Sequence, residues 1–554
     1  MAHSFSVRRP FGRPTVSSES LAILTGLWLA ITCNRPFWLA VTGSYDWGTP
    51  SAWFYGSTLF IALTCLHVLI ALPLLSRRTT RPVLAVLVFV AAVASYYTGH
   101  YGVFLDPGML RNALHSEPKE AADLIGGGLF VHLALVALPA WLLLIRVRIA
   151  DRSLGRALLR RVVAVVGTFA LFAIALLAAY PDLAPTMRNQ PEARYLITPA
   201  NLVYSATRLA VKSRRESAVA RVPIGVDAVR HATAVPRRPV MLLLVVGETA
   251  RAANWGLSGY ARDTTPALRA RNVINFADVT SCGTDTETSV PCLFAPVGRR
   301  DYDETRIRRS ESLLHVLART GIEVSWRDNQ TGCKGVCDGF PFETIDTAGR
   351  PDCLPGRCLD EHLLDGLEQR FDSADRVVVL HMVGSHGPAY DNRYPAGQDV
   401  FRPICGQLDL RRCTDAQLVN SYDNSIRYTD RVLAQAIDLL AAHSQTHDVA
   451  LLYVSDHGES LGEHRLYLHG VPWRIAPQEQ RKVPMILWLS EGFRHRLALD
   501  EACLRRRAAT PVAHDHVFHS VLGLLDVATS IHEPSLDVVT PCRRYDALVA
   551  NRRD

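Results

Sequence analysis

The sequence predicts an α-helical membrane domain of five transmembrane helices, followed by an α/β domain in which helices cover both faces of a mainly parallel sheet. Three observations predict this. Apolar runs crowd the first third of the 554 residues, whereas ten of the twelve cysteines follow residue 180. After residue 236, short runs rich in Val and Leu alternate with helical patterns, which is typical of helices packed on both faces of a sheet.

The composition excludes several other classes of protein. Hydrophobic residues make up 48% of the chain, enough to bury a core, so the chain is not disordered. Charged residues make up only 20%, below the roughly 25% of a soluble domain, and the mean hydropathy is +0.08. The net charge of +7 is modest for this length, so no nucleic-acid partner is expected.

Five apolar stretches approach the roughly 20 residues that a helix needs to cross the hydrocarbon layer. They lie at about 20–42, 54–75, 82–100, 126–146 and 160–180. Asn34, Arg35 and Pro36 interrupt the first stretch, so the pattern does not define its ends. A cleavable signal peptide fits the pattern poorly because one apolar segment follows another. Helices buried in a soluble bundle would show polar faces, and residues 169–179 show none.

Arginines mark one side of the predicted membrane. They precede the first stretch and lie between the second and third and between the fourth and fifth, while segments 43–53 and 101–125 hold few positive charges. Positive loops stay in the cytoplasm, so five crossings place everything after residue 180 outside. The sequence therefore predicts a bacterial inner-membrane protein with its second part in the periplasm.

The ten later cysteines fit this topology, because disulfides form in oxidising compartments. Pairing of neighbours along the sequence is expected. The expected pairs are 282–292, 333–337, 353–358, 405–413 and 503–542. The alternative is structural zinc held by the Cys-x3-Cys and Cys-x4-Cys pairs.

A connector rich in Pro, Arg and Ala separates the two parts. An amphipathic helix is expected between Asn201 and Lys212, with its apolar side on lipid, although an ordinary surface helix fits the pattern equally well. The predicted organisation is a transmembrane domain over 1–180, a linker over 181–236 and a periplasmic domain over 237–554.

Residues that can bind a metal ion or take part in catalysis follow three of the predicted strands. The strands span Pro239 to Val246, Arg376 to His381 and Val449 to Ser455, with helices expected over 310–319 and 418–442. Ligands in such sheets bind beyond the carboxyl ends of the strands. These ends deliver Glu248, His386, Asp456 and His457. Each residue alone has an ordinary interpretation in a helix start or a solvent loop, but carboxylates and imidazole at one edge indicate a catalytic zinc site.

A segment dense in hydroxyl groups supplies a candidate nucleophile. It runs from Ser281 to Cys292 and is flanked by two cysteines. A hydroxyl bound to Zn²⁺ loses its proton far more readily than a free one. Thr286, at a helix start, would also gain backbone N–H groups for an anionic group. The alternative is a set of helix-capping residues without chemistry.

Five stretches of the chain resemble, in order, the motifs of the phosphoethanolamine transferases that modify lipid A, a family that includes the mobile colistin-resistance enzymes. They are VVGETARAANWGLSGY, VTSCGTDTETSVPCLF, WRDNQTGCKGVCD, LHMVGSHGPAY and VSDHGESLGEHRLYLHG. The resemblance spans nearly the whole chain, including the five spans and the loop LDPGMLRNALHSEPKEAADL. It implies an α/β/α alkaline phosphatase-like fold for the periplasmic domain, and the threonine-bearing segment between two cysteines distinguishes this group from ordinary sulfatases.

The resemblance implies roles for matching positions. Thr286 would be the nucleophile and would bind zinc together with Glu248, Asp456 and His457. His386 and His469 would hold the phosphoryl group, move a proton or bind a second zinc ion. The residues implied in binding the donor lipid are Lys334, Asn329 and Gln330, and, in the loop after the third span, Asn112 and Glu120. A prolyl bond between Glu117 and Pro118 departs from the pattern of the family and weakens the assignment of Glu120.

The implied reaction is a double displacement. Thr286 attacks the phosphorus of phosphatidylethanolamine and diacylglycerol leaves; a phosphate of lipid A then takes the headgroup from the phosphothreonine. Capping that phosphate lowers the negative charge of the surface and weakens binding of cationic peptides such as polymyxins.

Three alternatives remain open from the sequence. Gly458 to Gly462 matches the G-x-S-x-G elbow of serine hydrolases, with Asp515 and His519 as triad partners for Ser460. A zinc phosphodiesterase or sulfatase would keep the metal residues and release its product to water. A non-enzymatic membrane sensor would lack site residues, and none is missing. Relatives of this pattern also modify heptose, glucans or proteins, so the acceptor is not defined by the sequence.

Overall fold

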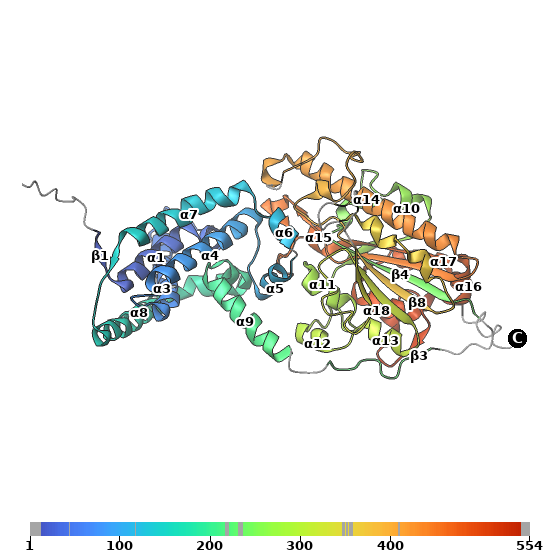
Figure 1. Ribbon diagram of the computed structural model, residues 1–554, viewed down its shortest axis with the longest axis horizontal. Helices are drawn as coiled ribbons and strands as arrows, with labels where there is room; N and C mark the ends of the chain where they lie inside the picture. Colours follow the sequence, from blue (N-terminus) through green and yellow to red (C-terminus); the bar gives the residue numbers. More distant parts are fainter. Residues whose placement is uncertain are drawn as a thin grey trace, which may run out of the picture. The chain divides into compact units, whose positions relative to one another are not determined.

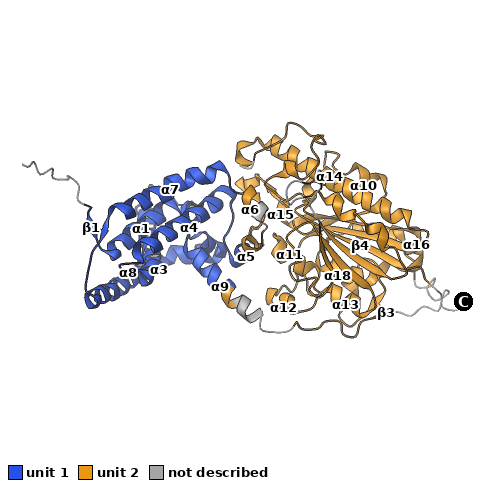
Figure 2. Ribbon diagram, viewed as in Figure 1, with its two compact units in different colours: residues 1–110, 125–209 blue, residues 111–124, 210–554 orange. Residues whose placement is uncertain are grey.

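The computed structural model describes residues 13–43, 45–116, 118–216, 221–230, 237–345, 350, 353, 358–407 and 410–544. The chain forms two compact units (Figure 2). The first comprises residues 1–110 and 125–209, and the second comprises residues 111–124 and 210–554. The short segment 111–124 thus leaves the helical unit and joins the larger one.

The first unit is a bundle of apolar helices. Its helices are α1 (Ser18–Thr32), α2 (Arg35–Thr42), α3 (Pro50–Ala71), α4 (Thr80–Tyr101), α7 (Gly127–Arg146), α8 (Leu154–Asn189) and the first part of α9 (Ala200–Glu216). Within the described part of the chain, four segments are long and apolar enough to cross a membrane: Pro50–Leu74, α4, α7 and α8. Many of their large apolar side chains are exposed, as expected of surfaces that face lipid.

The first predicted span is not one helix, because Asn34 interrupts it. Helix α1 ends at Thr32 after 15 residues, and α2 begins at Arg35. The Asn34 side chain is buried, donates to the carbonyl oxygens of Leu29 and Thr198 at 2.9 Å each, and accepts from the Thr198 N–H. A buried amide with these three bonds fixes the break in the helix, so four helices, rather than five, reach spanning length among the described residues.

The fifth span is longer than predicted. Helix α8 continues to Asn189 and contains Pro181 and Pro185, which were expected in the connector. A proline removes its own N–H bond but leaves the rest of the ladder available, and apolar helices tolerate it. The expected amphipathic helix lies within α9; the side chain of Lys212 falls outside the described residues.

The second unit contains a sheet of eight strands in the order β13-β5-β12-β9-β4-β8-β6-β7. The strands are β4 (Val240–Gly247), β5 (Ile274–Thr280), β6 (Glu323–Asp328), β7 (Phe342–Thr344), β8 (Arg376–His381), β9 (Asp448–Ser455), β12 (Lys482–Leu489) and β13 (Val512–Ala513). Strand β12 pairs antiparallel with both of its neighbours, and the other pairings are parallel. The predicted mainly parallel sheet is confirmed, and its central strands β4 and β9 are buried along their whole length.

Helices cover both faces of this sheet (Figure 1). Helices α10 (Pro266–Ala270) and α14 (Asp415–Ala442) lie on one face, and α11 (Thr286–Leu293), α13 (Leu313–Arg319) and α18 (Asp515–Leu524) lie on the other. The largest apolar core contains side chains of β4 and β9 together with those of α13 and α18. The predicted three-layer arrangement is therefore confirmed, and the carboxyl ends of the parallel strands meet at one edge.

Helix α14 holds α10 through a buried carboxylate whose stability contribution depends on pH. Asp430 accepts from the backbone N–H groups of Ala267 and Leu268 at 2.9 and 2.8 Å, and burial raises the pKa of Asp430 to about 6. The same carboxyl has a pKa near 3.9 when unfolded, so the folded state binds its proton more tightly. Stability is therefore lost as pH rises from about 4 to 6, by roughly 3 kcal/mol.

The variant Asp430→Asn does not titrate in this range. We expect its thermal unfolding midpoint, measured on the full chain in detergent, to rise relative to that of the wild type between pH 4 and pH 7. Asp438→Asn, which changes an exposed carboxylate on the same helix paired with Arg271, is the matched control. A difference between Asp430→Asn and wild type that stays constant with pH would contradict this account.

Candidate active site

Sheet register brings two acidic residues together at the carboxyl edge. Strands β4 and β9 are parallel neighbours, and Gly247 pairs with Ser455. The next residue of each strand, Glu248 and Asp456, therefore leaves the sheet beside the other. Both side chains are fully buried. The register therefore brings the ends of these two strands side by side, which is the arrangement that the predicted site requires.

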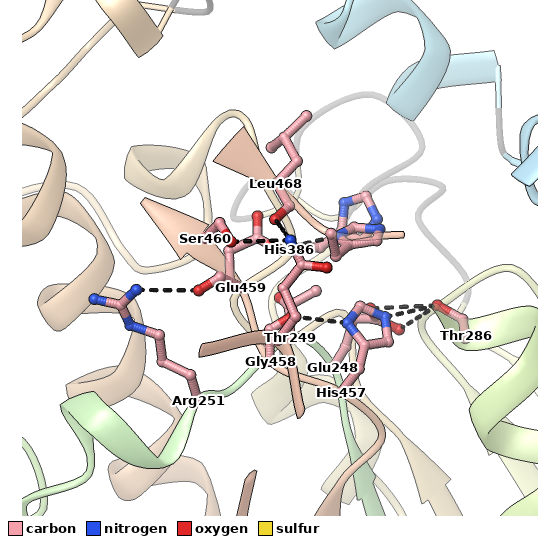
Figure 3. Close-up of polar contacts among 12 residues, drawn as sticks. Glu248, Thr249, Arg251, Thr286, His386, His457, Gly458, Glu459, Ser460 and Leu468 are labelled. Carbon is pink, nitrogen blue, oxygen red and sulfur yellow. Dashed lines mark hydrogen bonds and ion pairs between the residues drawn. The ribbon is translucent and has the colours of Figure 1, made fainter. Parts of the chain in front are cut away.

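A helix start brings the candidate nucleophile to the same place. Thr286 is the first residue of α11, and the side chain of Asp285 caps this helix by accepting from the Thr288 N–H at 2.9 Å. The Thr286 hydroxyl oxygen lies 3.1 and 3.3 Å from the two carboxylate oxygens of Glu248 and 3.4 Å from Nε2 of His457 (Figure 3). The threonine, the carboxylates and the imidazole thus form one cluster.

The geometry of His457 directs a ring nitrogen into this cluster. Its Nδ1 lies 3.0 Å from the carbonyl oxygen of Gly458, so Nδ1 carries the hydrogen and Nε2 faces the carboxylates. Nε2 lies 3.2 Å from Glu248 and 3.3 Å from Asp456. Gly384, with a φ of +53°, completes the wall, because a Cβ there would lie 2.5 Å from the Glu248 carbonyl oxygen.

Strong electrostatic coupling links the buried groups. Burial opposes ionisation of Glu248, but the facing His457 outweighs it and lowers the pKa of this carboxyl. Burial and the neighbouring Glu248 raise the pKa of Asp456 to about 8. Burial works against charge on His457, but Asp456 and Glu248 outweigh it and raise its pKa to about 10. Two carboxylates and an imidazole this close compensate one another by sharing a proton or by binding a cation.

The cluster suits a zinc ion. One ligand atom each from Glu248, Asp456 and His457 lies within 4.8 Å of the others, and the Oδ2 atom of Asp456 is buried without a hydrogen-bond partner. Asp456 Oδ1 is already used, because it accepts from the N–H groups of Thr249 and His457. Carboxylate oxygens and an imidazole nitrogen are ligands that zinc prefers, and bound zinc would replace the proton that Nε2 of His457 otherwise holds between the carboxylates.

Two further histidines lie beside the cluster. The ring centroid of His469 lies 4.4 Å from that of His457 and 5.1 Å from that of His386. His469 Nδ1 bonds at 2.8 Å to a carboxylate oxygen of Glu459, whose other oxygen accepts from the Tyr390 hydroxyl at 2.6 Å. Removal from water lowers the pKa of His386 to about 3, so this ring is neutral. Glu459 fixes the orientation of His469 and leaves its Nε2 for a ligand.

The sequence analysis did not predict Glu459 as a site residue. Its bond to His469 gives it the role of positioning that ring. The variant Glu459→Gln keeps the shape of the side chain but removes the charge that orients the His469 ring. We expect kcat for the reaction of this site to fall about 10- to 100-fold, with a smaller change in KM. The measurement is steady-state turnover of the purified enzyme. Glu491→Gln, at an exposed glutamate, is the control, and equal losses in both variants would contradict the positioning role.

A second ionic cluster lies directly beside the nucleophile. Glu287 is buried, and three side-chain nitrogens lie close to its carboxylate oxygens. They belong to Arg308 at 3.0 Å, Lys334 at 3.4 Å and His115 at 2.9 Å. Lys334 has a positive φ of 52° between Cys333 and Gly335, and its ammonium is almost fully buried. The sequence predicted Lys334 but not Glu287, Arg308 or His115. Because Glu287 follows Thr286 directly, Arg308 and Lys334 balance the charge of a buried carboxylate in the first turn of α11.

The residues implied in donor binding lie in different places. Gln330 joins the cluster, donating from Nε2 to Glu248 at 2.8 Å. Asn329 is turned elsewhere, because its amide donates to the Cys358 carbonyl oxygen and to Asp360. Asn112 is half-buried on α5 (Pro107–His115). Glu120 is on α6 (Pro118–Asp123), but its side chain lies outside the described residues.

The cysteine prediction is confirmed in full. Disulfides join 282–292, 333–337, 353–358, 405–413 and 503–542. The alternative of structural zinc on the closely spaced pairs is therefore wrong, since bridged sulfurs are not thiolate ligands. The bridge between Cys282 and Cys292 closes the segment that carries Thr286.

The serine hydrolase alternative is also wrong. The Ser460 hydroxyl is buried and accepts from Gln480 at 2.9 Å. Asp515 accepts from the backbone N–H groups of Arg299 and Arg300. The remaining triad candidate, His519, faces the carbonyl oxygen of Pro296 and the N–H of Glu533. These three residues have structural partners and form no triad.

Comparison with known families assigns the second unit to a class. Residues 241–527 match the sulfatase family. Residues 63–214 match a second family, described as phosphoethanolamine transferase EptA/EptB. One chain therefore combines a sulfatase-type domain with the membrane part of these transferases.

Full-length relatives extend the match to the whole chain. Phosphoethanolamine transferase EptA of Escherichia coli (strain K12) is 35% identical over 97% of this chain and 99% of its own length. Phosphatidylethanolamine transferase Mcr-1 of Escherichia coli is 34% identical over 93% of this chain and 96% of its own. The solved structure of the integral membrane lipooligosaccharide phosphoethanolamine transferase A from Neisseria meningitidis matches with a TM-score of 0.89 and 33% identity, covering 96% of this chain and 100% of that one. The chain belongs to the phosphoethanolamine transferase family.

Proposed function

We propose that this chain transfers phosphoethanolamine from phosphatidylethanolamine to a phosphate of lipid A, through a phosphothreonine on Thr286 and with Zn²⁺ as cofactor. The observation that carries the proposal is the position of the Thr286 hydroxyl, 3.1 Å from Glu248 and 3.4 Å from His457. The names of the relatives support phosphoethanolamine as the transferred group. The word lipooligosaccharide in one of these names supports lipid A as the acceptor.

The first half-reaction makes the phosphothreonine. Glu248, Asp456, His457 and Thr286 would hold Zn²⁺, which when bound supplies a lower pKa for the hydroxyl and offsets charge on phosphoryl oxygens. The Thr286 hydroxyl gives its proton to the Glu248 carboxylate, to which it donates at 3.1 Å, and its oxygen forms a bond to the phosphorus of the donor. The bond from phosphorus to the diacylglycerol oxygen breaks. That oxygen takes a proton, which His469, oriented by Glu459, is placed to deliver.

The second half-reaction returns the enzyme to its starting state. An oxygen of the lipid A phosphate attacks the same phosphorus, the bond to Thr286 breaks, and the threonine oxygen regains a proton. His386 and His469 hold phosphoryl oxygens during both steps. Lys334, Gln330, Asn112 and Glu120 contribute to binding the donor, while the amide of Asn329 is engaged by Cys358 and Asp360. Capping the phosphate with an amine removes negative charge from the cell surface and confers polymyxin resistance.

The placement in the cell belongs to the same proposal. Five crossings, with α1 and α2 together forming the first, put residues 1–180 in the bacterial inner membrane. Residues 237–554 then act in the periplasm, and 181–236 link the two parts. Five disulfides in the second unit support an oxidising compartment.

A labelled donor tests the proposal. Purified enzyme is incubated with phosphatidylethanolamine labelled in its headgroup, and peptides are examined by mass spectrometry before and after addition of lipid A. The expected result is a phosphoethanolamine adduct on Thr286 that disappears as labelled lipid A forms. Release of phosphoethanolamine to water without an adduct would instead favour the phosphodiesterase, and transfer to a heptose, glucan or protein would change the acceptor.

A further inference from the structure

A cavity of about 350 Å³ lies in the second unit, and its lining includes Arg308 and Lys334, which both pair with Glu287. Four cationic side chains line it, Arg221, Arg308, Arg309 and Lys334, against two carboxylates. Its volume falls within the range of small-molecule sites. The cavity is not part of the cluster around Thr286, but Lys334 and Arg308 both contact Glu287, the next residue of the chain.

The carboxylates of the cavity are already engaged. Asp338 pairs with Arg221 at 2.5 Å. Glu311 pairs with Arg319 and accepts from the Ile224 N–H. Arg308 and Lys334 are satisfied by Glu287, and Arg308 also by Glu304. The remaining cation determines what the cavity attracts.

Arg309 is that cation. No described residue offers its guanidinium a hydrogen bond or an ion pair, and its Nε is removed from solvent without an acceptor. A guanidinium presents several donors in a planar fork that fits the oxygens of a phosphate. A buried N–H without an acceptor is unfavourable, and an anionic group in the cavity would satisfy it.

The walls of the cavity are held in place covalently and by the backbone. The disulfide between Cys333 and Cys337 closes the turn that carries Lys334. Gly335, with a φ of +87°, lies against Arg221, where a Cβ would come within 2.9 Å of a guanidinium nitrogen. Ser310, another lining residue, is held by a backbone bridge to Val222. The cationic groups are therefore organised before a ligand arrives.

We propose that this cavity binds a second phosphate of the acceptor while the first phosphate lies at Thr286. The inference rests on the proposed transfer to lipid A and specifies how the acceptor is recognised. Lipid A is a phosphorylated disaccharide with a phosphate at each end. Helix α11 connects the two places, since Thr286 begins it and Pro291, five residues on, lines the cavity, a rise of roughly 7.5 Å. In this proposal one bisphosphorylated acceptor engages both places.

The test compares two acceptors in the full-length enzyme. Wild type, Arg309→Ala and Arg309→Lys are assayed with bisphosphorylated lipid A and with the form that lacks one phosphate. We expect Arg309→Ala to raise KM for the bisphosphorylated acceptor about tenfold or more, and to abolish the preference of the wild type for it. Arg309→Lys, which keeps the charge, should recover part of that preference. Arg306→Ala, on the same helix but outside the cavity, is the matched control.

Other outcomes overturn the inference. If Arg309→Ala raised KM equally for both acceptors, or left both values unchanged, the cavity would not bind the second phosphate. A slower formation of the Thr286 adduct from phosphatidylethanolamine in Arg309→Ala would assign the cavity to the donor headgroup. Competition by inorganic phosphate that is lost in Arg309→Ala, with acceptor preference unchanged, would make it a site for free phosphate only. Failure of the wild type to form the Thr286 adduct at all would instead contradict the proposed function. As a control for folding, the variants should have the same thermal unfolding midpoint as the wild type.

Discussion

Replacing Thr286 with alanine is expected to reduce transfer by at least about a thousandfold, because the variant lacks the oxygen that accepts the phosphoryl group. The hydroxyl is the group in the cluster that faces Glu248 and His457 together. The measurement is the initial rate of labelled headgroup transfer to lipid A, together with the mass of the peptide that carries residue 286. Neither the adduct nor the product should form.

Two variants make this result specific. Thr286→Ser retains a hydroxyl on the first residue of α11 and should retain measurable transfer. Thr288→Ala, which removes a hydroxyl two residues further along the same helix, should transfer nearly as well as wild type. Ser460→Ala should also remain active. Adduct formation in Thr286→Ala, or inactivity of Ser460→Ala in a folded protein, would contradict the assignment of the nucleophile.

Removal of zinc is expected to have the second-largest effect. Chelation should abolish transfer, and added Zn²⁺ should restore it, because the cluster holds two carboxylates, an imidazole and a hydroxyl with one carboxylate oxygen unpartnered. The metal should also stabilise the fold by about 4 kcal/mol when zinc is about a thousandfold above its Kd. Thermal unfolding followed with and without added metal measures this gain.

The variant Glu248→Gln separates metal binding from a general effect of the chelator. It should bind zinc weakly, show little thermal stabilisation by the metal and stay inactive at zinc concentrations that restore the wild type. Glu533→Gln, which changes an exposed glutamate paired with Arg300, should behave as wild type. Full activity in protein shown by elemental analysis to contain no metal would exclude the zinc site.

The central part of the site could be predicted because it follows from strand ends. Uninterrupted apolar runs identify β4 and β9, and a parallel sheet places whatever follows them at one edge, so Glu248 and Asp456 are found without knowledge of register. The nucleophile segment is marked by its two cysteines. Pairing each cysteine with the next one along the chain was sufficient to predict all five disulfides, although the cysteines of the last pair are 39 residues apart.

Contacts between distant loops could not be predicted. His115 meets Glu287 across 172 positions of sequence, and nothing in either local pattern specifies that approach. Glu459 lies in a glycine-rich turn whose pattern suggested a different catalytic serine, and only the folded turn shows its bond to His469. The length of α1 depends on the contact between Asn34 and Thr198, so hydropathy alone could not define its end.

The order of the cysteine pairs has a consequence for biogenesis. Each of the five bridges joins a cysteine to the next one along the second unit. The shortest separation between paired cysteines is four residues. An oxidase that links thiols in the order in which the polypeptide emerges therefore produces the native set directly, and no wrong pair has to be reshuffled. We therefore expect the yield of mature protein to depend on an oxidising compartment and to depend little on a disulfide isomerase.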